Sequence, residues 1–182
     1  MCDICPVALA GFLDNKIRRC LQNPRTILEP YIKEGMTALD VGCGPGFFSI
    51  DMAHLAGKSG SVICADLQDG MLEKIRRKIK GTDLEHTVKL HKCGNNGIGL
   101  TEQVDFALAF YMVHEVPDQK TLLEEVKSIL KPTGQFLIIE PKYIHVSKKD
   151  FERTLETARE VGFKIAGGPD VFFSQSAALI NS

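Results

Sequence analysis

Short runs of apolar and β-branched residues alternate along this chain with longer runs whose apolar positions recur every three or four residues. The short runs predict seven strands. The longer runs, clearest at residues 122–130 and 151–158, predict amphipathic helices. This alternation predicts an α/β domain with a mainly parallel sheet and helices on both faces. The predicted strands are residues 37–41, 61–66, 87–91, 105–110, 135–140, 163–166 and 171–179.

Several residues mark the ends of these elements. Asp118 and Ser147 are predicted N-caps, and Gly162 is a predicted C-terminal stop. Residues 167–170 (Gly-Gly-Pro-Asp) join the last two predicted strands and are too few for a crossover helix. We therefore expect these two strands to form an antiparallel hairpin at the edge of the sheet.

A helical prefix precedes the first strand. Its first helix carries one apolar stripe, and Asn23-Pro24 is typical of the start of a second helix. We expect residues 1–35 to form an N-terminal cover on a core of residues 36–182, both within one domain. The stripe consists of Leu9, Phe12, Leu13, Ile17, Cys20 and Leu21.

Composition narrows the class of protein. With 182 residues, 44% of them apolar and 25% charged, the chain is long enough for one globular core. A net charge of −1 gives no long-range attraction to nucleic acid or to anionic lipid. No apolar run reaches the roughly 18 to 20 residues that cross a bilayer. We expect a cytoplasmic protein, monomeric or homodimeric, whose six cysteines are reduced.

A glycine-rich turn follows the first predicted strand. The glycines stand at 42, 44 and 46, Asp40 precedes them, and Phe47 occupies the position of the third glycine of a dinucleotide-binding turn. Glycine lets a ligand approach the backbone closely. A carboxylate here repels a pyrophosphate but attracts an ammonium group. The turn therefore favours an amino-acid-like cationic ligand over a dinucleotide.

The stretch LDVGCGPGFFS around this turn resembles the first motif of the class I S-adenosylmethionine-dependent methyltransferases. The resemblance is closest to the small-molecule enzymes of ubiquinone and menaquinone biosynthesis and to arsenite methyltransferases, and it extends over residues 37–140. It implies a Rossmann-like, seven-stranded, mostly parallel sheet with an antiparallel last strand. It also implies S-adenosylmethionine as cofactor, S-adenosylhomocysteine as product and a small-molecule methyl acceptor.

The resemblance also implies which residues bind the cofactor. Asp66, at the end of the second strand, holds the ribose hydroxyls in this family, and Leu67 and Met71 pack near the adenine. The chain departs from the family at the third strand, where Cys93 stands in place of the usual acid and Asn95 is left to contact the adenine. The full predicted set is Asp40, Gly42, Cys43, Gly44, Pro45, Gly46, Asp66, Leu67, Met71, Cys93, Gly94, Asn95 and Phe110.

The predicted catalytic residues follow the fourth strand. His114 and Glu115 are candidate bases and Tyr111 is a candidate hydrogen-bond donor; as an alternative, the His-Glu pair is a structural hydrogen-bond pair or a helix cap. Methyl transfer from a sulfonium is an in-line displacement, so much of the catalysis is positioning. The Asn/Asp-Pro-Pro-Tyr/Phe motif of amino-group methyltransferases is absent, which disfavours nucleic acid as acceptor.

Three alternatives remain open. The first is a metalloid or thiol methyltransferase that uses Cys20, Cys43, Cys64 and Cys93 as ligands. The second is a non-catalytic S-adenosylmethionine-binding module. The third is a nicotinamide-dependent oxidoreductase, which Phe47 disfavours because it replaces the third glycine of a dinucleotide-binding turn. The Cys2-x-x-Cys5 pair has no second pair, so we expect no metal site. The basic run 74–80 fits the solvated face of a helix better than an RNA-binding surface.

Overall fold

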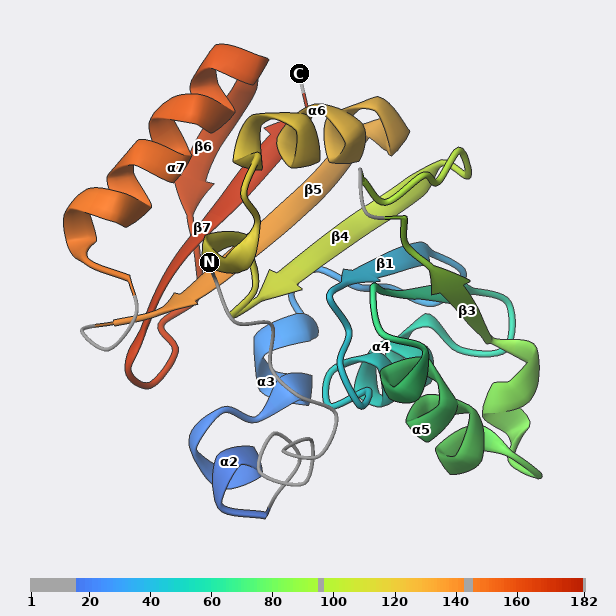
Figure 1. The fold of residues 1–182 in the computed structure, drawn as a ribbon. Helices are drawn as coiled ribbons and strands as arrows, with labels where there is room; N and C mark the ends of the chain where they lie inside the picture. Colours follow the sequence, from blue (N-terminus) through green and yellow to red (C-terminus); the bar gives the residue numbers. More distant parts are fainter. Residues whose placement is uncertain (1–15, 95–96, 143–145, 182) are drawn as a thin grey trace.

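Seven strands form one twisted sheet in the computed structural model, which describes residues 16–94, 97–142 and 146–181 (Figure 1). The strand order is β3-β2-β1-β4-β5-β7-β6. Neighbouring strands from β3 to β5 pair in parallel, whereas β7 pairs antiparallel with both β5 and β6. This confirms the predicted fold class and the predicted terminal hairpin. The strands are β1 (Thr37–Val41), β2 (Ser61–Asp66), β3 (Val88–Lys92), β4 (Val104–Phe110), β5 (Leu130–Pro141), β6 (Phe163–Gly167) and β7 (Ser174–Asn181).

Helices lie on both faces of the sheet. Apolar side chains of α6 and α7 pack on one face, and those of α3, α4 and α5 pack on the other (Figure 1). On α5, Leu72, Ile75 and Ile79 are buried while residues 76–78 are exposed, which confirms the predicted solvated face. The helices are α2 (Lys16–Leu21), α3 (Pro24–Leu28), α4 (Ser49–Ala56), α5 (Asp69–Ile79), α6 (Gln119–Ile129) and α7 (Lys148–Val161), with short 3₁₀ turns η2 (Asp83–His86) and η3 (Val113–Glu115).

The predicted helix ends are confirmed. The side chain of Asp118 accepts a hydrogen bond from the backbone of Thr121, and that of Ser147 accepts one from Asp150. Gly162 ends α7 at φ +97°, a left-handed conformation that glycine adopts without steric cost. Asn23 caps α3, whose first residue is Pro24. Residues Leu9, Phe12 and Leu13 of the predicted N-terminal stripe, and also Cys2 and Cys5, lie outside the described residues.

Three predicted strand boundaries were wrong: the start of β5 and both ends of β7, which ends at Asn181 instead of residue 179. β5 begins at Leu130 instead of residue 135, because residues 131–134 bulge out of the pairing with β4 before the regular register starts at Gln135. β7 begins at Ser174 instead of residue 171, because residues 168–173 are used to turn the chain. The remaining strands match the prediction within one residue at each end.

The strand order creates a switch point between β1 and β4. From β1 the chain builds outward through β2 to β3, and it then returns to place β4 on the other side of β1. In open α/β sheets, ligands bind beyond the carboxyl ends of the strands at such a point. The glycine turn after β1 and the segment after β4 therefore meet at the expected ligand-binding edge.

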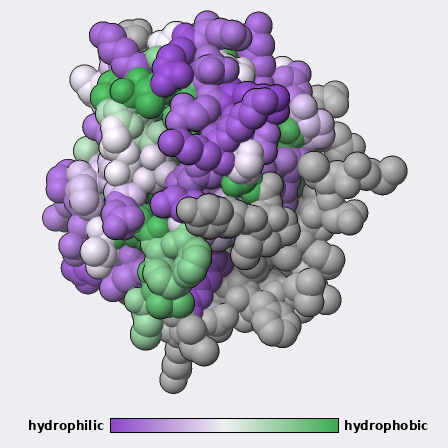
Figure 2. Space-filling view, turned by 90° about the vertical axis from the view of Figure 1, so that its left-hand side faces the viewer, coloured by the Kyte–Doolittle hydropathy of each residue, from purple (hydrophilic) through white to green (hydrophobic). Residues whose placement is uncertain are grey.

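The surface carries few large apolar side chains. Figure 2 shows mainly hydrophilic side chains, with smaller hydrophobic patches, on the face that lies to the left in Figure 1. Among the described residues, the exposed large apolar side chains are Leu21, Phe172 and Phe173. No helix in the described part of the chain is both long enough and apolar enough to cross a membrane.

Candidate cofactor and active site

The glycine turn is held against β2 by its backbone. The N–H groups of Gly42 and Cys43 both donate to the carbonyl of Ala65, at 2.8 and 3.1 Å. Gly42, Gly44 and Gly46 have φ of +65°, +53° and +84°, a region that other residues rarely adopt. The turn therefore requires glycine at all three positions for its conformation alone.

The space beside each glycine differs. A Cβ at Gly42 would lie 3.1 Å from the side chain of Met112, and one at Gly46 would lie 2.9 Å from Ile75 of α5. A Cβ at Gly44 would meet no atom within 4 Å. Gly42 and Gly46 thus allow close packing, whereas Gly44 borders open space. Of the three glycines in the predicted ligand-binding turn, Gly44 is thus the one with room for a ligand beside it.

Asp66 joins the end of β2 to the glycine turn. Its Oδ2 accepts a hydrogen bond from the N–H of Gly44 at 2.9 Å, and its Oδ1 accepts one from Gln68 at 2.7 Å. Burial raises the pKa of the Asp66 carboxyl, and these two hydrogen bonds partly oppose that shift. The carboxylate is thus an acceptor placed directly beside the open space at Gly44.

Asp40 is the second buried carboxyl group of the site. It is 3% exposed and accepts a hydrogen bond from the Ser49 hydroxyl at 2.5 Å. Burial raises its pKa to about 7, against the opposing effect of Ser49, and the nearby Asp66 raises it further. Because a buried carboxylate is costly without a counter-charge, an ammonium group beside Asp40 would be stabilised by it.

The remaining predicted cofactor residues surround these two carboxyl groups. Leu67 is half-buried directly after Asp66, whereas Met71 is 2% exposed and packed inside. The backbone N–H of Cys93 donates to the Asp66 carbonyl at 3.0 Å, which brings the end of β3 to the site. Asn95 lies outside the described residues, so its predicted contact with adenine stays a prediction.

Of the four cysteines among the described residues, Cys43 and Cys64 are buried and Cys93 is half-buried. Cys43 and Cys64 are in contact, and burial raises the pKa of the Cys43 thiol well above its usual value. Burial likewise raises the pKa of Cys93 to about 11, while Cys20 is exposed on α2. Within residues 16–94, 97–142 and 146–181, no three His, Cys, Asp or Glu side chains are grouped so that they could hold a metal ion. This arrangement disfavours thiolate ligands for a metalloid.

Helix α2 packs over the aromatic side chains beside the glycine turn. The guanidinium of Arg18 lies 4.3 Å from the ring centre of Phe47 and 5.2 Å from that of Phe110. The guanidinium of Arg19 pairs with Asp51 of α4 at 2.6 Å. These contacts place the described end of the N-terminal prefix against the ligand-binding edge.

Tyr111 connects three segments at the end of β4. It has φ +58°, which is uncommon for a residue with a side chain. Its hydroxyl accepts a hydrogen bond from Gln22 at 2.6 Å and lies 2.6 Å from the Ser174 hydroxyl. Gln22, which also donates to the carbonyl of Phe172, was not predicted as part of the site. Tyr111 thus ties the end of α2 to the loop before β7.

His114 pairs with a carboxylate that the sequence analysis did not single out. Its Nδ1 lies 2.5 Å from Oε2 of Glu140, the penultimate residue of β5, and this hydrogen bond raises the pKa of His114. Glu115 is half-exposed, and its charge also raises the pKa of His114. The signal for Glu140 was available, since it is an acid at the end of an apolar strand, as Asp40 and Asp66 are.

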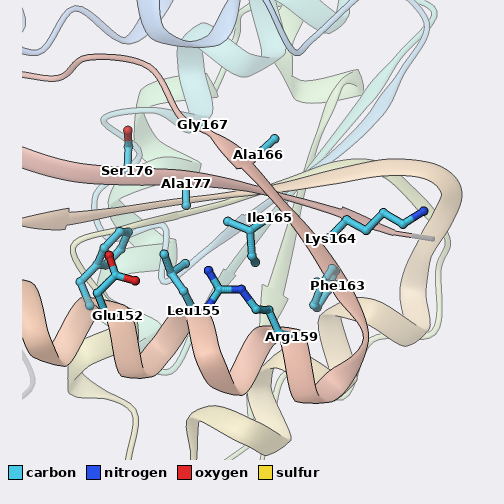
Figure 3. A pocket seen from close by; sticks show the side chains of 11 residues that line it. Glu152, Leu155, Arg159, Phe163, Lys164, Ile165, Ala166, Gly167, Ser176 and Ala177 are labelled. Atoms are coloured by element: carbon cyan, nitrogen blue, oxygen red, sulfur yellow. The ribbon is translucent and has the colours of Figure 1, made fainter.

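A surface groove lies away from these residues. It is an open groove of about 740 Å³ between α7 and the edge strand β6, and Figure 3 shows its lining side chains, including Leu155, Arg159 and Ile165. None of the predicted cofactor or catalytic residues lines it. The candidate site is therefore defined by strand ends and hydrogen bonds, not by the size of a hollow.

Comparison with known proteins agrees with this geometry. Residues 32–167 match a family model described as "Methyltransferase domain". Demethylmenaquinone methyltransferases from Lactobacillus johnsonii and Bacillus subtilis are 34% and 33% identical over 110 and 112 residues, which cover 60% of this chain and 45% and 47% of the relatives. The chain thus spans about half the length of these relatives. A crystal structure titled as a SAM dependent methyltransferase from Aquifex aeolicus superposes with a TM-score of 0.87 at 26% identity, over 98% of this chain and 100% of that one.

Proposed function

The chain belongs to the methyltransferase-domain family of S-adenosylmethionine-dependent enzymes, and from this premise we propose that it transfers a methyl group to a small-molecule acceptor by in-line displacement. The observation that carries the proposal is the glycine turn, where the open space at Gly44 lies beside the carboxylate of Asp66. A ligand with hydroxyl groups and an ammonium group matches the two acceptors there, Asp66 and Asp40.

Each part of the cofactor has a candidate partner. Asp66 accepts hydrogen bonds from the ribose hydroxyls, because its oxygens already lie at the open edge of the turn. Asp40 faces the ammonium group, which offsets the cost of its burial. Half-buried Leu67 packs against the adenine. When bound, S-adenosylmethionine supplies an electrophilic methyl group on a sulfonium.

The acceptor binds beside the segment after β4, which carries Tyr111 and His114. Two relatives are named for methylation of demethylmenaquinone, so a menaquinone precursor or a similar quinol is the first acceptor to test. Tyr111 and His114 lie after β4, where they orient the acceptor and take its proton. Glu115 contributes negative charge near His114. We expect the enzyme to act in the cytoplasm, on small molecules rather than nucleic acid.

Titration calorimetry with S-adenosylhomocysteine tests the cofactor site. Wild-type protein should bind it, and Asp66→Ala should bind at least about tenfold more weakly, since two charge-assisted hydrogen bonds are lost. Asp69→Ala is the matched control, because the Asp69 side chain is 82% exposed and lies three residues away. Failure of folded wild-type protein to bind either S-adenosylmethionine or its product would overturn the proposal.

A methyl-transfer assay tests the reaction. Protein, S-adenosylmethionine labelled in the methyl group and a panel of reduced quinols should yield a labelled organic product by mass spectrometry. Arsenite and simple thiols belong in the same panel. If only these compounds are methylated, the acceptor is not a quinol. Binding of the donor with no transfer to any acceptor would instead support a non-catalytic module.

A further inference from the structure

Glu140 is more deeply buried and more fully bonded than any candidate named from the sequence for catalysis. It is 2% exposed at the end of β5. Its Oε1 accepts a hydrogen bond from the backbone N–H of Val113 at 2.8 Å and a longer one from that of His114 at 3.4 Å. Its Oε2 lies 2.5 Å from the His114 Nδ1. The carboxylate is therefore fixed relative to η3, and the imidazole is fixed relative to the carboxylate.

This geometry selects one form of the imidazole. A buried carboxylate accepts hydrogen bonds and cannot donate, so Nδ1 of His114 must carry the proton. In neutral histidine the proton on Nδ1 leaves the lone pair on Nε2. Glu140 thus holds His114 in the tautomer in which Nε2 can receive a proton.

A small cavity adjoins this pair. It has a volume of about 170 Å³, similar to the roughly 150 Å³ of a cavity that accommodates benzene, so one six-membered ring fits. It is lined by His114, Gln119, Glu140, Val146, Asp150 and Thr154.

The polar groups of the cavity wall favour a ligand that donates hydrogen bonds. The Thr154 hydroxyl donates to Gln119 Oε1 at 2.8 Å, and Gln119 Nε2 donates to the Val113 carbonyl at 3.2 Å. The carboxylates of Glu140 and Asp150 are acceptors, as is Nε2 of neutral His114. The hydrogen bond to Glu140 raises the pKa of His114, burial opposes this shift, and the charges of Glu140 and Glu115 add to it. When His114 is neutral, a hydroxyl that donates to Nε2 matches this acceptor and can also pass its proton to it.

We propose that Glu140 is the positioning residue for His114, and that the cavity beside them receives an ionisable hydroxyl on a ring of the methyl acceptor. This inference rests on the proposed methyltransferase function. The O–H proton passes to Nε2 of His114, and the resulting phenolate or enolate attacks the methyl group through oxygen or through its conjugated carbon. The bond between sulfur and the methyl carbon breaks, and its electron pair stays on sulfur.

Nuclear magnetic resonance of protein labelled with ¹⁵N in its histidines tests the interaction of His114 with Glu140 in the absence of any methyl acceptor. His114→Gln assigns the signal. In wild-type protein, neutral His114 should be protonated on Nδ1, and its pKa should lie above the ordinary value. In Glu140→Gln that pKa should fall, whereas Glu156→Gln, which removes an exposed carboxylate from α7, should leave it unchanged. A wild-type His114 protonated on Nε2, or an unchanged pKa in Glu140→Gln, would overturn the proposal.

An activity assay tests the role of the pair in catalysis. The probe is 1,4-dihydroxynaphthalene, kept reduced, with S-adenosylmethionine as donor. We expect the rate to rise with pH through the pKa of His114, and in Glu140→Gln the midpoint should move to lower pH while the maximal rate falls at least about tenfold. His114→Gln keeps a side chain that can donate to Glu140 and should lose about a hundredfold or more in rate, without loss of S-adenosylhomocysteine affinity.

The two proposals fail differently. If wild-type protein does not bind S-adenosylhomocysteine, the proposed function fails, whatever the state of His114. If it binds S-adenosylhomocysteine and methylates the probe, but Glu140→Gln keeps the wild-type pH profile, only the inference about Glu140 fails. Methylation of amines in preference to hydroxylated rings would also contradict it.

Discussion

The carboxyl group of Asp40 makes stability depend on pH in a direction opposite to that of most acidic residues. Its pKa of about 7 in the folded protein lies above the ordinary aspartate pKa of 3.8. Between these values the folded state holds a proton that the unfolded state has lost, so the free energy of unfolding falls as pH rises. The slope is at most about 1.4 kcal/mol per pH unit from this one group.

Asp40→Asn should remove that slope. In urea titrations between pH 4.5 and 8.5, wild-type protein should lose stability relative to Asp40→Asn as pH rises, and the difference should level off above about pH 8. Asp69→Asn, which changes an exposed acid, should run parallel to wild type. If the stabilities of Asp40→Asn and wild type stay parallel over this range, burial does not raise the pKa of the Asp40 carboxyl.

Single residues could be predicted where one strand end carries the signal. Asp40 and Asp66 each close an apolar run, and the structure places both next to the glycine turn. Glu140 carries the same local signal, but its importance depends on His114, which lies 26 residues away in sequence. Gln22 has no local signal at all, since its contact with Tyr111 spans 89 residues. Pairings of this kind follow from tertiary packing and not from the local sequence.

Among the elements, α7 has an N-cap that can be tested without disturbing its buried face. The exposed hydroxyl of Ser147 accepts a hydrogen bond from the N–H of Asp150 at 3.1 Å. Ser147→Ala should lower the free energy of unfolding by about 1 kcal/mol. Ser128→Ala, inside α6, is the control and should change stability little, because alanine favours a helix interior. Equal effects of the two substitutions in urea titrations would argue against a capping role.

Helix α2 depends on the Tyr111 hydroxyl, and trypsin can report on this because Arg18 and Arg19 lie within the helix. Tyr111→Phe leaves buried Gln22 without that acceptor, at a cost of about 1 kcal/mol, so cleavage after these arginines should be roughly fivefold faster. Tyr31→Phe is the matched control, since its ring stacks on Phe106 and should hold without the hydroxyl. Cleavage at the wild-type rate in Tyr111→Phe would show that other contacts hold α2.

The extent of each element was predicted best where burial is uniform. β1 and β2 are buried on both faces and match their predicted limits. β5 was predicted too short, because Lys131-Pro132-Thr133-Gly134 has turn composition although the flanking residues pair with β4. A bulge combines a turn-like sequence with continued pairing, so composition alone does not distinguish it from the end of a strand.

At the scale of the whole molecule, periodicity predicted a parallel α/β sheet with a terminal hairpin, but it did not predict the strand order. The pairing of β4 with β1 and the position of β7 between β5 and β6 depend on contacts between strands that are distant in the sequence. The resemblance at the glycine turn supplied what periodicity lacked, namely a fold with this topology. The glycine turn could be predicted as a ligand-binding turn from its own residues, but the switch point that brings it beside the end of β4 could be predicted only through that resemblance.

Because the site draws on β1, β2, β4 and the prefix, its ligand should stabilise the molecule as a whole. A ligand that binds only the folded state at about 100 times its Kd adds roughly 2.7 kcal/mol. For a chain of this size that corresponds to a rise in Tm of roughly 5 to 11 °C. We expect S-adenosylhomocysteine to produce such a shift in wild-type protein, and Asp66→Ala to show much less of it at the same concentration.

NAD is the contrasting ligand in this measurement. Asp40 lies within two residues of the glycine turn and would repel a pyrophosphate, and Phe47 replaces the glycine that a dinucleotide turn uses. NAD should therefore leave Tm unchanged at a concentration where S-adenosylhomocysteine raises it. Stabilisation by NAD that Asp66→Ala abolishes, with none from S-adenosylhomocysteine, would instead point to an oxidoreductase, because the same carboxylate can hold the ribose of either ligand.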